Sequence, residues 1–100
     1  MDTSEGKQVW DYSIFVQGVF GRNRKVKREL FNIAKHLDSP LPLDQALALM
    51  DAKLVKLKFK GAYSYKLEER TGSVKNEGGF EIYTTNLFGN TKLLKEGTVN

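Results

Sequence analysis

Apolar and polar side chains alternate over residues 9–20, which predicts a β-strand because successive strand residues face opposite sides. One set of alternate positions forms the expected core face: Trp10, Tyr12, Ile14, Val16 and Phe20. The other set is half polar. Phe15 belongs to this second set, so we expect it either to be covered by the chain or to meet a partner.

A turn at Gly21 ends this strand, and the apolar residues that follow recur with a helical period. With Asn23 as its N-cap, the pattern predicts a helix from about Arg24 to Leu37. The expected buried arc of this helix consists of Val26, Leu30, Ile33, Ala34 and Leu37. Basic side chains lie on the opposite face, so the predicted helix is amphipathic.

Two prolines, Pro40 and Pro42, exclude a continuation of that helix and indicate an extended connection. A second helix is predicted to start near Leu43 or Asp44, with Asp44 as its cap. Its expected buried stripe consists of Leu43, Leu47, Met50 and Leu54. We interpret this segment as scaffold.

The second half of the chain predicts two more strands. Residues 55–67 alternate apolar side chains with lysines, which favours a strand bent at Gly61. Residues 70–79 are polar and rich in turn formers, which is typical of a connection. Residues 80–88 predict another strand, pairing antiparallel with the lysine-bearing one, and Leu93 and Leu94 are expected to dock.

Together these elements predict one α+β domain in the order β-α-α-β-β, with two helices packed on one face of a small, mainly antiparallel sheet. A length of 100 residues suits a single domain. We expect a flexible arm over residues 1–8, the domain over residues 9–94 and a frayed end over residues 95–100.

The absence of cysteine from the sequence excludes disulfides, thiolate zinc sites and cysteine nucleophiles. The first residues lack the basic start and apolar run of a signal peptide, and no stretch has the roughly 18 apolar residues of a membrane span. We therefore expect an intracellular protein, cytoplasmic or, in a eukaryote, nuclear, without a membrane partner.

The usual constellations of enzymes are missing from the sequence. His36 is the one histidine, and no phosphate-binding glycine loop, nucleophile elbow or zinc-protease motif is present. We therefore predict that the chain is not an enzyme and uses no catalytic residue, metal or cofactor.

The net charge of +4 conceals two concentrated basic blocks. Residues 20–36 carry six basic residues and one acid, and residues 53–66 carry five lysines and no acid. Such blocks indicate an acidic partner, most commonly nucleic acid. Lysine-rich elements that simply face water would give the same pattern.

Nucleic-acid binding is the leading functional hypothesis. Basic residues in the first turn oppose the helix dipole, which makes sense if an anion occupies the helix N-terminus. The proposed phosphate contacts at this strand-turn-helix corner and along the helix are Arg22, Asn23, Arg24, Lys25, Lys27, Arg28 and Lys35. A second track is expected on the lysine-bearing strand at Lys56, Lys58 and Lys60, joined by Lys66. Aromatic residues beside these lysines also allow single-strand stacking.

A protein-interaction or regulatory module is the alternative. As an inhibitor or assembly factor, the chain would place its basic blocks against an acidic partner protein, with Phe15 or Phe31 as the anchor.

Overall fold

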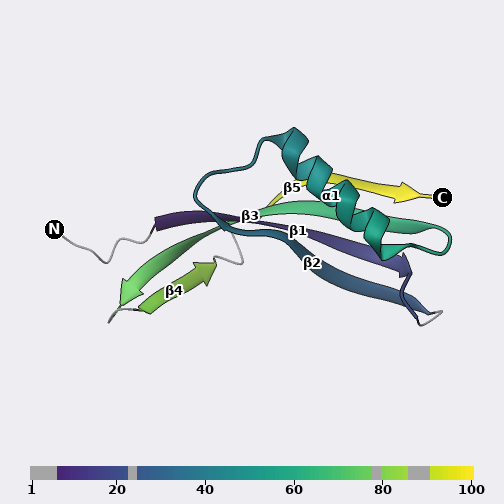
Figure 1. The fold of residues 1–100 in the computed structure, drawn as a ribbon, viewed down its shortest axis with the longest axis horizontal. Helices are drawn as coiled ribbons and strands as arrows, with labels where there is room; N and C mark the ends of the chain where they lie inside the picture. Colours follow the sequence, from purple (N-terminus) through teal and green to yellow (C-terminus); the bar gives the residue numbers. More distant parts are fainter. Residues whose placement is uncertain (1–6, 23–24, 78–79, 86–90) are drawn as a thin grey trace.

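A computed structural model of the chain describes residues 7–22, 25–77, 80–85 and 91–100 (Figure 1). Over these residues the chain forms five strands and one helix, in the order β1 (Lys7–Val19), β2 (Val26–Leu37), α1 (Leu43–Leu57), β3 (Tyr63–Glu77), β4 (Phe80–Thr85) and β5 (Thr91–Val99). The strands make one antiparallel sheet, and α1 lies across one of its faces (Figure 1).

The long strand β3 organises the sheet. One of its edges pairs with β1, which in turn pairs with β2. The other edge is shared by two strands, since β5 pairs with residues 63–70 and β4 with residues 72–77. Beside β5 the sheet is therefore four strands wide, in the order β2-β1-β3-β5. Beyond the end of β2 it continues as β1-β3-β4.

The predicted arrangement of two helices is wrong, because Val26–Leu37 is the strand β2. Asn23 and Arg24, the expected cap and first residue of that helix, lie outside the described residues. The pairing of β2 with β1 runs from Val26, which lies opposite Val19, to Leu37, which lies opposite Trp10, and its register is irregular near Tyr12. A strand as apolar as β1 needs a hydrogen-bonding neighbour on each edge, and this long-range pairing overrides a short helical period.

The second predicted helix is present as α1, although its details differ. It begins at Leu43 after Pro42, which occupies the N-cap position, and Asp44 lies in its first turn without capping it. Its buried residues are Ala46, Met50 and Leu54, whereas Leu43 is exposed. α1 continues to Leu57, and Lys58 ends it in the left-handed conformation with φ 52°.

Three other expectations also change. The strand predicted over residues 55–67 begins only at Tyr63, because its first residues complete α1. The expected connection over residues 70–79 is strand as far as Glu77, paired with β1 and β4. β4 is described as far as Thr85, and residues 86–88 of the strand predicted there lie outside the described residues. Residues 91–99 form β5, which includes positions expected to fray.

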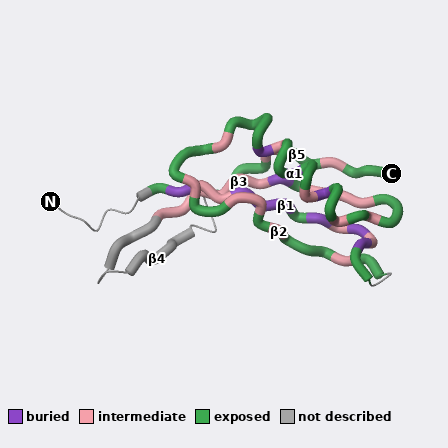
Figure 2. Tube along the Cα trace, in the orientation of Figure 1, coloured by how far each residue is buried: buried purple, intermediate pink, exposed green. Residues whose placement is uncertain are grey.

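The core lies between α1 and the face of the sheet that it covers (Figure 2). It contains the even-numbered residues expected from the β1 pattern, together with the α1 stripe and one residue of β3: Tyr12, Ile14, Val16, Phe20, Ala46, Met50, Leu54 and Leu67. Trp10 is half-buried and packs against them. No described element covers the opposite face of the sheet, which we call the open face.

Tyr12 ties the connection before α1 to the sheet. Its fully buried hydroxyl donates a 2.7 Å hydrogen bond to Oε2 of Glu69 and accepts one of 2.8 Å from the backbone N–H of Leu41. Burial, reinforced by the hydrogen bond to Glu69, raises the pKa of Tyr12 to about 12. The hydroxyl is therefore neutral at physiological pH and serves as a structural clamp.

Candidate functional site

The two basic blocks of the sequence meet at one end of the sheet. The connection between β1 and β2 lies there, and so does the connection between α1 and β3 (Figure 1). The backbone N–H of Lys60 donates a 2.7 Å hydrogen bond to the carbonyl of Val19, which joins the two connections directly. We call this region the cationic end and define it by Arg22, Lys25, Lys27, Lys58 and Lys60.

Glycines shape both connections. Gly21 has φ 79° and Gly61 has φ 96°, backbone conformations that residues with a Cβ rarely adopt. A third glycine, Gly18, permits a close approach, since a Cβ there would lie 2.6 Å from Cβ of Tyr63. These positions allow the turn after β1 and the start of β3 to pack closely together.

Aromatic contacts fix the connection between α1 and β3 against β1. The rings of Phe59 and Tyr63 are stacked, with centroids 3.8 Å apart and planes 11° from parallel. Phe59 also meets Phe20 edge to face at 5.1 Å. Such aromatic pairs stabilise the folded protein beyond the contribution of the apolar area that they bury. The lysines on either side of Phe59 are thus carried by a packed segment of the chain.

The charges of the cationic end are mostly open to solvent. Arg22, Lys25, Lys58 and Lys60 are exposed. Lys27 is half-buried, and its Nζ lies 5.7 Å from the centroid of the Phe20 ring. The described residues that build this end, 20–22, 25–28 and 56–63, contain no aspartate or glutamate. The local potential is therefore positive.

The predicted anion site at a helix N-terminus does not exist, because a strand follows the turn at Gly21. Without a helix there is no macrodipole for the basic residues to oppose, which removes the conflict noted in the sequence. Arg22 and Lys25 remain beside the turn, as predicted from their position in the chain. Asn23 and Arg24 lie outside the described residues.

The remaining predicted contacts are dispersed. Arg28 is exposed on β2, opposite Gln17, and Lys35 is exposed far along the same strand. The predicted lysine track along a strand is wrong: Lys56 lies in the last turn of α1, Lys58 caps it, and Lys60 follows in the connection. Lys66 alone of these lysines lies in a strand.

The two phenylalanines proposed as partner anchors have different surroundings. Phe31 is half-buried against the core, with Nζ of Lys53 4.4 Å from its ring centroid. Phe15 is 37% exposed on the open face. Of the two, therefore, only Phe15 has a ring that is accessible to a partner.

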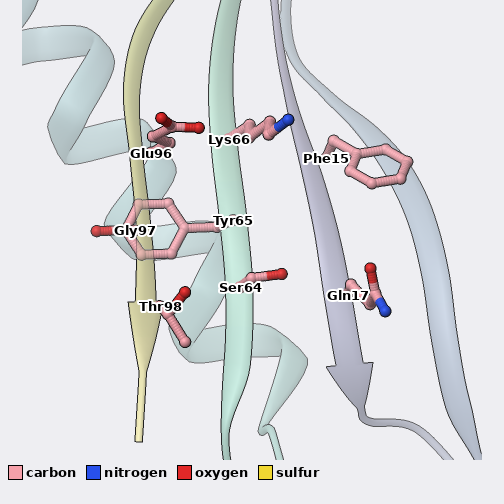
Figure 3. Close-up of a pocket in the computed structure, with 8 residues that line it drawn as sticks. All are labelled: Phe15, Gln17, Ser64, Tyr65, Lys66, Glu96, Gly97 and Thr98. Atoms are coloured by element: carbon pink, nitrogen blue, oxygen red, sulfur yellow. The ribbon is translucent and has the colours of Figure 1, made fainter.

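A hollow of about 410 Å³ lies beside Phe15 on the open face (Figure 3). In that view α1 lies behind the sheet, and Lys66 extends from β3 toward β1, which carries Phe15 and Gln17. Ser64, Glu96 and Thr98 complete the polar lining. Sequence reasoning missed Glu96 and Thr98 because residues 91–99 show no clean alternation that predicts a strand beside β3.

Within the described part of the chain, no group of three or more histidine, aspartate or glutamate side chains is arranged to hold a metal ion. The helix of the described structure is too short to cross a membrane.

Comparison with known proteins gave no family model, no curated protein and no solved structure that matches this chain.

Proposed function

We propose that the chain binds nucleic acid, with the cationic end contacting phosphates. The observation that carries this proposal is the hydrogen bond from Lys60 to Val19, because it brings two basic segments, distant in the sequence, to the same end of the sheet. Five cations gathered without an intervening acid form an electrostatic footprint for a polyanion.

Lysine and arginine neutralise phosphates and release the counterions condensed on nucleic acid, which supplies binding free energy without reading sequence. The side chain of Lys27 lies near the Phe20 ring, and a hydrogen bond to Val19 fixes the backbone of Lys60. Both residues therefore lose less conformational freedom on binding than lysines on a mobile segment would. The proposal is accordingly for affinity through phosphate contacts.

A triple variant tests this function: Arg22→Ala, Lys25→Ala and Lys60→Ala. Titration of fluorescently labelled DNA and RNA by anisotropy at low salt should show binding by the wild type and a loss of at least tenfold in the variant. The matched control removes three exposed lysines outside the cationic end, Lys35, Lys92 and Lys95, with the same change in net charge. The control should retain most of the wild-type affinity.

Equal losses in the two triple variants would show that only net charge matters and would contradict a defined interface. Absence of binding by the wild type to every nucleic acid at low salt would contradict the proposed function, and would favour an acidic protein as the partner of the cationic end.

A further inference from the structure

The open face places the aromatic ring of Phe15 beside one cation, Lys66, and one row from another, Arg28. Phe15 pairs with Leu30 of β2 on one side and with Lys66 of β3 on the other. In the next row toward the cationic end, Gln17 pairs with Arg28 and with Ser64. Paired residues on one face of an antiparallel sheet lie about 5 Å apart, so these side chains form one continuous patch.

Two hollows of the open face share part of their lining and together form a furrow. The hollow beside Phe15, of about 410 Å³, and a second of about 300 Å³ are both lined by Gln17, Ser64 and Thr98. The second hollow is also lined by Val26 and Ala62, which are neighbours in sequence of Lys25, Lys27 and the Lys60–Gly61 turn. The furrow therefore leads from the cationic end to Phe15.

We infer that this furrow binds a single-stranded segment of nucleic acid, with a base stacked on the Phe15 ring and its phosphates near Arg28 and Lys66. The inference rests on the proposed function and specifies its substrate. Base stacking on an exposed aromatic ring is independent of base identity, and cations beside the ring hold the backbone.

The polar groups of the furrow favour an unpaired strand. The amide of Gln17 offers both donors and an acceptor, and the carboxylate of Glu96 accepts hydrogen bonds from base amino groups. These groups match base edges that are free in a single strand and engaged in a duplex. Glu96 is the one acid in the lining of the two hollows, and its repulsion of phosphate is opposed by Lys66, its partner across β3 and β5.

The length of the furrow fits a short oligonucleotide. Val19 at the cationic end lies four positions along β1 from Phe15, a span of about 13 Å at the rise of an antiparallel strand. Farther along the open face, the guanidinium of Arg70 is 3.7 Å from the Glu68 carboxylate and is engaged by it. The basic side chains along the furrow thus end close to Lys66.

The test uses one labelled oligonucleotide of about twelve nucleotides, as RNA and as DNA, each as a single strand and as a duplex. Phe15→Ala should lower single-strand affinity by about 5- to 150-fold, the range for loss of one base stack, and leave duplex affinity unchanged. The control is Leu49→Ala, which truncates an apolar side chain of similar exposure, 40%, on α1. It should change neither affinity.

A second variant reports stacking directly. Phe15→Trp should retain single-strand binding. Both proteins contain Trp10, so the oligonucleotide should quench the tryptophan fluorescence of Phe15→Trp more than that of the wild type. Equal urea midpoints for wild type and Phe15→Ala establish that the variant is folded.

Unchanged single-strand affinity in Phe15→Ala, with affinity still dependent on the cationic end, would overturn the furrow inference and leave the proposed function standing. That result is also the one expected if the furrow takes a protein segment. Equal affinity of the wild type for single strand and duplex would likewise overturn it. Absence of binding to every nucleic acid tested would instead contradict the proposed function itself.

Discussion

Lys60 and Val19 are joined by a 2.7 Å backbone hydrogen bond that closes the connection between α1 and β3 onto the end of β1. The contact is between main-chain groups, so neither side chain is needed to make it. The side chain of Lys60 is exposed, and that of Val19 is half-buried. The geometry of the cationic end therefore depends on how the backbone packs, and residues that control this packing should affect function indirectly.

Gly18 is the residue whose substitution should disturb this packing most. A Cβ at this position would meet Cβ of Tyr63 at 2.6 Å and the Phe59 ring at 3.0 Å, so the adjoining strand must shift. We expect Gly18→Ala to lower the free energy of unfolding by about 1 to 3 kcal/mol, measured by urea denaturation.

Gly97→Ala is the matched control for that substitution, because both glycines lie in strands and a Cβ at Gly97 would also be crowded, at 2.7 Å. The atom it would meet is the hydroxyl oxygen of Tyr65, at the far end of a side chain that can rotate away. Gly97→Ala should therefore cost less than Gly18→Ala. The reverse order would show that the backbone approach at Gly18 is described wrongly.

Tyr12→Phe should destabilise the protein although the ring volume is nearly unchanged. The substitution removes the donor to Glu69 and the acceptor for the N–H of Leu41, leaving two part-buried polar groups without this partner. The expected loss is about 1 to 2 kcal/mol by urea denaturation. Tyr65→Phe, which removes a hydroxyl beside β5, should have a smaller effect (Figure 3). Equal stability of Tyr12→Phe and wild type would contradict the clamp.

The same hydroxyl predicts a dependence of stability on alkaline pH. The unfolded chain loses the Tyr12 proton near pH 10.0, whereas the folded protein holds it until about pH 12. Between these values ionisation favours the unfolded chain, so stability is fully present below pH 10 and falls as the pH rises through this window. The loss attributable to Tyr12 is about 2 to 3 kcal/mol by pH 12.

The difference between wild type and Tyr12→Phe isolates this contribution, since the two proteins share every other titratable group. The free energy of unfolding should converge for the two proteins as the pH rises from 9 to 11.5. Parallel curves over that range would show that Tyr12 titrates at its ordinary pKa.

The strand assignment of Val26–Leu37 is directly observable by nuclear magnetic resonance. In isotope-labelled protein, Cα secondary shifts should be negative across β2 and positive across Leu43–Leu57. Positive shifts over both segments would restore the two-helix arrangement and contradict the sheet described above.

Local patterns were sufficient where an element buries one face by itself. The alternation in β1 identified Tyr12, Ile14, Val16 and Phe20 as core residues, and the helical period after Pro42 located α1. In both segments the periodicity of apolar residues matches the structure that forms, and packing against other elements does not change it.

Local patterns were insufficient where pairing decides the structure. Val26 and Leu30 fit a helical arc, yet they are 63% and 44% exposed on the open face, because β2 is held by its hydrogen bonds to β1. Residues 72–77 are polar and become strand through β4 and β1. Strand propensity depends on such neighbours and cannot be evaluated from one segment alone.

The candidate site was predictable in composition but not in geometry. The charge blocks contain Arg22, Lys25, Lys27, Lys58 and Lys60, but the sequence patterns assigned these residues to a turn, a helix and a strand. Their meeting depends on the left-handed conformation of Lys58, which glycine usually adopts where a helix ends in this way, and on the contact between Lys60 and Val19. Neither feature has a recognisable signal in the sequence.

The salt dependence of nucleic-acid binding tests the central claim most directly. The slope of the logarithm of the binding constant against the logarithm of salt concentration reports the number of phosphates neutralised, about 0.7 per contact for a single strand. The five residues of the cationic end account for about −3 to −4 of the wild-type slope, and Arg22→Ala/Lys25→Ala/Lys60→Ala should have a slope shallower by about 2. A slope that is the same in both proteins, or wild-type binding that is insensitive to salt, would contradict the account.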